Sequence, residues 1–241
     1  YMPTPGVPGV SDESRCGPGQ LTLGSTIGLG GNRNHWHKNA STDSLLFTGV
    51  NFTTPAISST SSYWVSTYND TTGCESTRRR VNAIINPIPG IPVVSDIENC
   101  GGDIFTIPAK PGTNGTTARW YDAPVGGTLL DTDTSYTTGT INVNTTLWVS
   151  SYNDTTGCEG SRIPVNIVIH PVPSQPFTND ESRCGAGTLT LTAAMGAGGT
   201  SLRWYDAPSG GTIIDTAATF TTPFLTATRS YWILSLIHIS E

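Results

Sequence analysis

The sequence predicts an all-β protein built from a repeated unit. Charged residues make up 12% of the 241 residues, about half the usual share for a soluble domain. The chain is rich in Thr, which favours strands, and its 27 glycines and 17 prolines favour turns. Several short segments either alternate between apolar and polar residues or are rich in β-branched residues, and turn residues bound them. This pattern is typical of strands, and examples are 21–23, 63–65, 81–85 and 165–169. No segment has a convincing helical pattern.

A spacing of 84 residues divides the chain into units. The string RWYDAPVGGTLLDT at 119–132 returns as RWYDAPSGGTIIDT at 203–216, and the proline-rich linker at 86–90 returns at 170–174. One cysteine and two tryptophans recur at this spacing: Cys16, Cys100 and Cys184; Trp36, Trp120 and Trp204; Trp64, Trp148 and Trp232. The predicted organisation is the end of a preceding linker at 1–6, then units at 7–90, 91–174 and 175–233.

Each unit has room for about seven short strands with frequent turn signals, which indicates a two-sheet sandwich. A hairpin turn is predicted at 124–127, after the strand that carries Trp120. Within a unit, Trp lies 20 residues after the first Cys, and the second Cys lies 58 residues after it. This is the spacing of an immunoglobulin-like domain, in which the Trp is buried. Trp36, Trp120 and Trp204 are therefore the predicted core residues.

The pattern C-G-x-G-x-L-T-L … R-W-Y-D-A-x-x-G-G-T … Y-W-V-S … G-C-E-S-x-R resembles the Ig-like modules strung in tandem through large secreted and surface proteins of Bacteroidota. Those proteins commonly end in a sorting domain for gliding-associated secretion. The resemblance covers all three units, although the first departs from it at 35–43. It implies extracellular localisation, secreted or attached to the cell surface, and roles in adhesion, spacing and display, and it carries no catalytic residues.

The expected function is thus a non-enzymatic array, acting as a stalk or adhesion module. The alternative is a carbohydrate-binding accessory module of a secreted hydrolase. The expected partners are neighbouring Ig-like units and surface glycans or proteins. A formal charge of −6 and a pI near 5.1 argue against nucleic acid, and no apolar run is long enough to predict a membrane-spanning helix.

Five cysteines are candidates for structural disulfides: Cys16, Cys74, Cys100, Cys158 and Cys184. Pairing within units would join Cys16 to Cys74 and Cys100 to Cys158. The predicted strand directions place such partners about 20 Å apart, whereas a disulfide needs Cα atoms within about 7 Å. A staggered pairing would join Cys16 to Cys158 across a joint and leave Cys100 to a cysteine due further along the third unit. Free thiols are the remaining alternative.

Other candidate sites have weaker signals. The repeated string YNDTTGCE, at 68–75 and 152–159, predicts a turn with possible glycan acceptors at Thr71 and Thr155. Tyr121 and Tyr205, on the strand face opposite the core Trp, are candidate ligand-contact aromatics. His35 and His37 share one strand face but lack an evident third ligand, so we expect no metal site and interpret them as a solvent-facing variant of the Arg-x-Tyr pair. Carboxylates at the joints leave Ca²⁺ as an open alternative to no cofactor.

The end of the chain departs from the repeat. After Ser230-Tyr231-Trp232-Ile233 the template predicts a third YNDTTGC-like turn, but the sequence reads LSLIHISE at 234–241. This octapeptide resembles a translated sequencing adapter, so we expect the third unit to lack its last strand.

Overall fold

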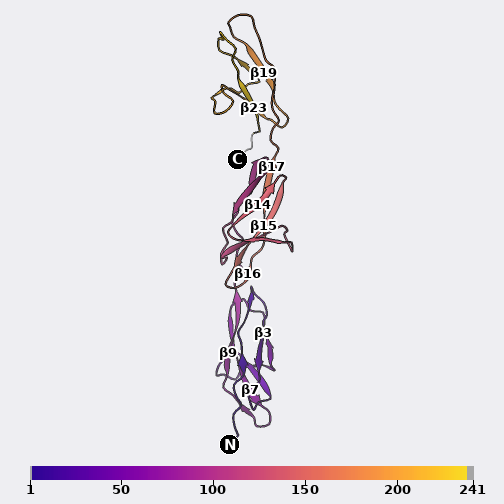
Figure 1. Ribbon diagram of the computed structural model, residues 1–241. Helices are drawn as coiled ribbons and strands as arrows, with labels where there is room; N and C mark the ends of the chain where they lie inside the picture. The colour runs from indigo at the N-terminus through magenta and orange to yellow at the C-terminus, as the bar shows by residue number, and fades with distance from the viewer. Residues whose placement is uncertain (1, 238–241) are drawn as a thin grey trace. The chain divides into compact units, whose positions relative to one another are not determined.

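The computed structural model describes residues 2–237 and is all-β over that range (Figure 1). The chain separates into two compact units, one comprising Tyr1–Asp96, Phe105–Thr138 and Thr146–Asn166, and the other Ile97–Ile104, Gly139–Thr145 and Ile167–Glu241. Residues 1 and 238–241 lie outside the described range, and with them His238–Glu241 of the predicted read-through segment. Because the repeats share one plan, we describe them in turn.

The first repeat is a sandwich of two sheets. One sheet has the order β1-β3-β6, and the other has the order β2-β9-β7-β4-β5 with the short strand β8 beside β7. Strands β2 and β9 are parallel, whereas the other described pairs are antiparallel. The strands are β1 (Gly9–Val10), β2 (Glu13–Cys16), β3 (Thr22–Thr26), β4 (Arg33–His37), β5 (Leu45–Thr48), β6 (Asn51–Thr53), β7 (Ser61–Asn69), β8 (Cys74–Glu75) and β9 (Arg79–Asn86).

The second repeat follows the same plan. Its larger sheet has the order β10-β17-β15-β12-β13 with β16 beside β15, and β11 pairs with β14 in the other sheet. Both repeats exceed the expected seven strands because two-residue segments such as β8 and β16 form separate ladders. The strands are β10 (Ile97–Cys100), β11 (Asp103–Pro108), β12 (Thr117–Tyr121), β13 (Leu129–Thr132), β14 (Ser135–Ile141), β15 (Thr145–Asn153), β16 (Cys158–Glu159) and β17 (Ile163–His170).

The third repeat has fewer strands among the described residues. Its sheets are β18-β19-β22 and β21-β20-β23, and within residues 2–237 no strand follows β23. Strand β23 continues to Leu236, which pairs with Ser201, so the ladder extends past the predicted boundary at 233. The strands are β18 (Phe177–Thr178), β19 (Thr190–Ala194), β20 (Ser201–Tyr205), β21 (Ile213–Asp215), β22 (Thr219–Thr221) and β23 (Trp232–Leu236).

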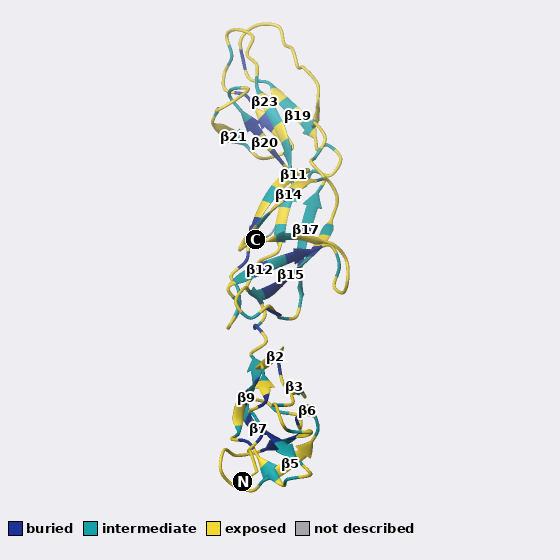
Figure 2. Cartoon of the chain, turned by 60° about the horizontal axis from the view of Figure 1, so that its bottom comes forward, coloured by how far each residue is buried: buried dark blue, intermediate teal, exposed yellow. Residues whose placement is uncertain are grey.

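Each repeat has one buried Trp, on β4, β12 and β20. Figure 2 shows buried positions, in dark blue, on the strands of the repeats. The exposed fractions of Trp36, Trp120 and Trp204 are 0%, 0% and 1%. Each indole N–H is satisfied by a backbone carbonyl 13 residues further on, as when Trp120 Nε1 donates to Asp133 O at 3.0 Å. Because a buried Trp needs such an acceptor, this bond fixes the ring within the thin core.

Each linker docks on the repeat that follows it through the same hydrogen bond. Gly6 N donates to Leu29 O at 2.8 Å, and Gly90 N donates to Thr113 O at 2.8 Å. Ser174 N donates to Ala197 O at 3.0 Å. The proline-rich linkers are therefore parts of the following domain rather than free tethers.

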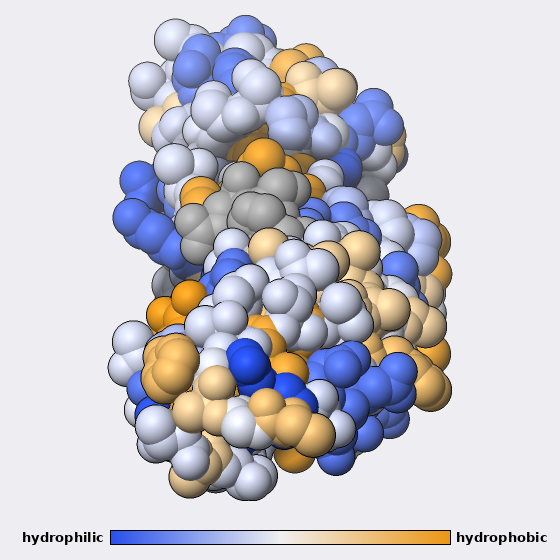
Figure 3. Space-filling view, turned by 90° about the horizontal axis from the view of Figure 1, so that it is seen from above, coloured by the Kyte–Doolittle hydropathy of each residue, from blue (hydrophilic) through white to orange (hydrophobic). Residues whose placement is uncertain are grey.

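Hydrophobic side chains at the surface are dispersed. On the face shown in Figure 3 they form small patches separated by hydrophilic residues. Single exposed apolar residues are normal for a folded domain. On the edge strand β5, three adjacent hydrophobic residues, Leu45, Leu46 and Phe47, are each more than 40% exposed.

Candidate functional site

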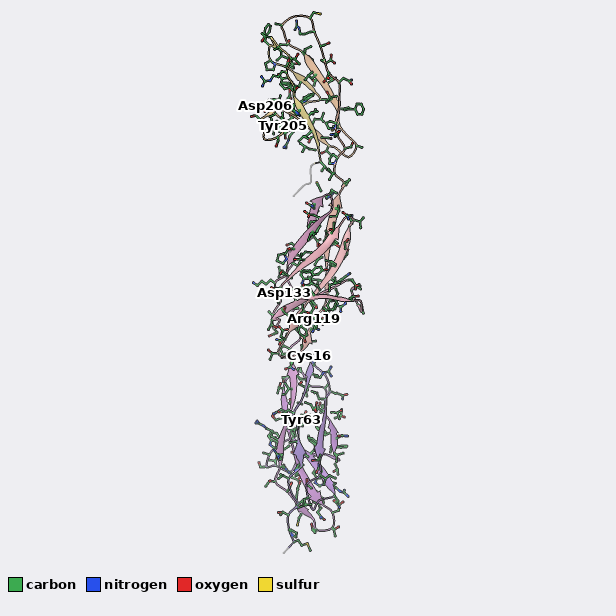
Figure 4. The ribbon with its side chains drawn as sticks, in the orientation of Figure 1. Cys16, Tyr63, Arg119, Asp133, Tyr205 and Asp206 are labelled. Atoms are coloured by element: carbon green, nitrogen blue, oxygen red, sulfur yellow. A yellow bond between two sulfur atoms is a disulfide. The ribbon has the colours of Figure 1, made fainter. Side chains whose placement is uncertain are left out.

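A disulfide joins the first repeat to the second. Cys16 Sγ and Cys158 Sγ are 2.01 Å apart, and their Cα atoms are 5.5 Å apart. Cys16 ends β2 beside Asn86, the last residue of β9, so it lies where the first repeat meets its linker (Figure 4). Cys158 begins β16, just after the turn that follows β15. The structure therefore contains the staggered pairing.

Pairing within units is wrong for the reason that strand direction gives. Cys16 lies beside the end of β9, whereas Cys74 lies beside Asn69, the end of β7. Because β7 and β9 are antiparallel, their last residues lie at opposite ends of the sheet along the strand direction. Cys74, Cys100 and Cys184 are not disulfide-bonded in the structure.

The YNDTTGCE string forms the turn that presents Cys158. Asn153 Oδ1 accepts hydrogen bonds from the backbone N–H groups of Thr155 and Thr156, both at 3.0 Å, and Asn153 Nδ2 donates to Asn114 O at 2.6 Å. Gly157 has a φ of 70°, a conformation that glycine adopts without strain. Asn69 makes the same bonds in the first repeat. The Asn is thus a structural residue, and in both copies the string forms the same turn.

The next position along the chain, Glu159, lies at the centre of a polar cluster that the sequence did not reveal. Its carboxylate accepts hydrogen bonds from Ser150 Oγ at 2.6 Å, Tyr121 Oη at 2.8 Å and Arg119 Nη1 at 3.1 Å. Burial opposes the charge of this carboxylate, but the hydrogen bonds from Ser150, Tyr121 and Arg119 outweigh it and lower the pKa of Glu159. The signal that would have found the cluster is the recurrence of Glu directly after the Cys of each YNDTTGCE string.

Glu75 occupies the same place in the first repeat, where its partners are histidines. Its Oε1 lies 3.2 Å from His37 Nε2 and 3.7 Å from His35 Nδ1, and it also accepts a hydrogen bond from Ser66 Oγ. His37 is 2% exposed, so the interpretation of this pair as solvent-facing is wrong for His37. The sequence does not reveal Glu75 as the third member of this group, because it lies 38 residues after His37. The pairing of β7 with β8 brings it to the histidines.

Tyr121 is not a surface aromatic. It is 6% exposed, and the guanidinium of Arg162 covers its ring at 3.2 Å. Tyr121 therefore does not offer the exposed ring that a ligand-contact role needs, because Arg162, just before β17, covers it. Tyr205 is half-buried and lies beside Asp206 in the third repeat (Figure 4). Thr71 and Thr155 are exposed, so their modification stays a prediction.

Two carboxylates near the unit entrances, those of Asp12 and Asp96, accept hydrogen bonds from an asparagine on the neighbouring strand. Asp12 accepts from Asn82 N at 2.7 Å and from Asn82 Nδ2 at 2.8 Å. Asp96 holds Asn166 in the same way, at 2.7 and 3.1 Å. These hydrogen bonds lower the pKa values of both aspartates. Each carboxylate thus ties the segment before β2 or β10 to the parallel strand beside it.

These features define a tandem array of immunoglobulin-like β-sandwiches with one joint closed by a disulfide. The chain belongs to the family of Ig-like domains described as CHU_C associated, whose model matches residues 5–87, 89–171 and 173–237. The predicted family and fold are thereby confirmed. No helix among the described residues is long and apolar enough to cross a membrane.

The chain is also similar to solved structures at low sequence identity. Titin domains A168–A170 are 13% identical, with 94% of this chain and 91% of that chain covered and a TM-score of 0.36. A marsupial T cell receptor is 8% identical, with 95% and 92% covered and a TM-score of 0.44. No curated protein matches the chain.

Proposed function

We propose that this chain is part of an extracellular stalk or adhesion module of a large bacterial secreted or surface protein, with no catalytic role of its own. The observation that carries the proposal is the Cys16–Cys158 disulfide, which links one repeat to the next. Disulfides persist in oxidising, extracytoplasmic environments. A covalent bond across a joint is useful in a protein that must keep its domains connected and ordered.

The bond changes how the chain carries tension. It bridges residues 142 apart in sequence, so a pull on the two ends passes from Cys16 directly to Cys158. The residues between them are outside the loaded path, and the cores around Trp36 and most of the second sandwich are protected from forced unfolding. This property suits a spacer that holds a binding surface away from a cell under flow.

Single-molecule pulling of the chain from its two ends tests the proposal. Under oxidising conditions, we expect the 142-residue segment to contribute no released length. With a reductant, the same chain should gain roughly 470–510 Å of contour length for the 142 residues, at about 3.3–3.6 Å per extended residue.

The matched control is a double variant, Cys16→Ser with Cys158→Ser, which should give the long contour length without reductant. If the oxidised native chain already releases the full length, the bond does not shield the repeats and the stalk proposal loses its support. Secretion is tested separately, by locating the parent protein on intact cells with an antibody to these repeats; detection only after lysis would contradict it.

A further inference from the structure

Three potential metal ligands converge on one face of the first repeat. They are His35, His37 and Glu75, and one ligand atom from each lies within 4.8 Å of the other two. The nitrogens nearest the Glu75 carboxylate are His35 Nδ1 and His37 Nε2. Two of the separations are 3.2 Å and 3.7 Å. Tetrahedral ligands at about 2.0–2.1 Å from a zinc ion are themselves about 3.3 Å apart. The cluster is therefore close to the size of a metal site.

The backbone holds these side chains in place. His35 and His37 flank the buried Trp36 on β4, so both point to the face opposite the core. Strand β7 pairs with β4 on one side and with β8 on the other, which brings Glu75 over Ser66 and the histidines. The His35 ring stacks on Tyr68 with centroids 4.5 Å apart. The ligands therefore come from paired strands and not from loops.

The second repeat has a hydrogen-bonded cluster where the first has the three potential ligands. There Arg119 and Tyr121 replace the histidines and donate hydrogen bonds to Glu159. A guanidinium has no acceptor lone pair and a protonated phenol is a poor metal ligand, whereas a neutral imidazole is the commonest one. The exchange of Arg-x-Tyr for His-x-His thus converts a set of donors around a glutamate into a set of ligands.

The state of His37 suits this use. Its ring is 2% exposed, and Nδ1 is buried without a hydrogen-bond partner. The other ring nitrogen, Nε2, lies 3.2 Å from the Glu75 carboxylate, so it is the nitrogen that faces the cluster.

We propose that His35, His37 and Glu75 bind one divalent transition-metal ion of the Zn²⁺ type. Two imidazoles and a carboxylate are a ligand set that such ions take, with a remaining position open to water or to a partner's ligand. Ser66 is a positioning residue, since its hydroxyl is buried and donates to the Glu75 carboxylate.

One nearby charge opposes the cation. Arg78 lies close enough to influence His37, but its guanidinium is held by the carbonyl oxygens of Asn39, at 2.9 Å, and Thr42, at 2.7 Å. It is therefore anchored to the 39–42 turn and is not hydrogen-bonded to Glu75. The Glu75 charge remains available to the ion.

Isothermal titration of the full chain with ZnCl₂ at pH 7.5 tests the site. Because free thiols also bind zinc, the background carries Cys74→Ser, Cys100→Ser and Cys184→Ser. We expect one ion per chain, with a visible tetrahedral absorption band when Co²⁺ replaces Zn²⁺. Glu75→Gln should weaken binding by about 10-fold or more.

The matched control is His35→Arg with His37→Tyr, which installs the set that the second repeat already folds with. This variant should keep its far-UV circular dichroism and lose the ion. The reverse change, Arg119→His with Tyr121→His, should raise the stoichiometry to two. Absence of binding in the thiol-free chain, or equal affinity in the His35→Arg/His37→Tyr variant, would overturn the proposal.

Discussion

The guanidinium of Arg162 lies 3.2 Å from the centre of the Tyr121 ring. The same guanidinium donates to Ala123 O at 2.9 Å and to Gly126 O at 2.6 Å, so one side chain covers the ring and ties down the β12–β13 turn. A cation over an aromatic ring contributes about 0.5–2 kcal/mol, and each hydrogen bond roughly 1 kcal/mol.

Replacement of this arginine should therefore loosen the second repeat. We expect Arg162→Ala to lower its free energy of unfolding by about 1–3 kcal/mol, measured by urea titration with Trp fluorescence. Arg229→Ala is the control, because that guanidinium lies 5.7 Å from the Tyr231 ring and is exposed. Equal effects of the two substitutions would show that the cover over Tyr121 contributes nothing specific.

Acid should weaken the strand connections made by Asp12 and Asp96. Hydrogen bonds from Asn82 and Asn166 hold the pKa values of these carboxyls below their usual range. A lowered native pKa gives stability that is complete above the unfolded pKa, about 3.9, and is lost as pH falls through the native value. We expect the Tm to fall below about pH 4, and to fall less steeply in Asp12→Asn with Asp96→Asn.

The control for this pH dependence is Asp43→Asn, an exposed carboxylate in the 39–44 segment. It should follow the native pH profile. A double variant whose Tm declines as steeply as that of the native chain would exclude these two aspartates as the source of the acid sensitivity.

Gly160 lies against the linker at the first joint. A Cβ at this position would be 2.4 Å from the backbone oxygen of Pro89. Gly160→Ala should therefore displace the linker, at a cost of roughly 1–3 kcal/mol, and lower the fraction of chains that form Cys16–Cys158 in a glutathione buffer. Gly139→Ala, whose Cβ meets nothing within 4 Å, is the matched control. An unchanged oxidised fraction in Gly160→Ala would mean that the linker yields without disturbing the joint.

Cys100 should be able to form the next bond of the same kind. It ends β10 beside His170, as Cys16 ends β2 beside Asn86. An extended chain, with residues 234–241 replaced by 150–157 and then continued with 158–170, carries a cysteine 84 positions after Cys158. Alkylation and mass spectrometry should then leave only Cys74 and Cys184 free. The same extension with serine at the new position should leave Cys100 free as well; a reactive Cys100 in both extensions would restrict the pairing to the first joint.

The repeat spacing is sufficient to predict the fold, because Trp36, Trp120 and Trp204 recur at the interval and Cys spacing typical of an immunoglobulin-like core. Strand direction also argued correctly against pairing Cys16 with Cys74. The sequence alone does not select Cys158 as the partner of Cys16. That choice depends on which end of the second sandwich faces the linker after the first repeat.

Only part of the candidate metal site can be predicted from the sequence. Two histidines on one strand face can be read from alternation, but the contact with Glu75 depends on a hairpin register that the letters YNDTTGCE do not specify. The burial of Tyr121 was missed for a related reason. Alternation places a side chain on the outer face, but it does not show that Arg162, 41 positions later, will cover it.

The covalent loop between Cys16 and Cys158 has a further consequence when the backbone is cut. A protease that cuts the backbone anywhere between these two residues leaves both fragments joined through sulfur. The exposed turn at Thr71 and the 122–128 turn lie inside this loop. A chain cut inside the loop would therefore remain one covalent molecule until a reductant separates the two fragments.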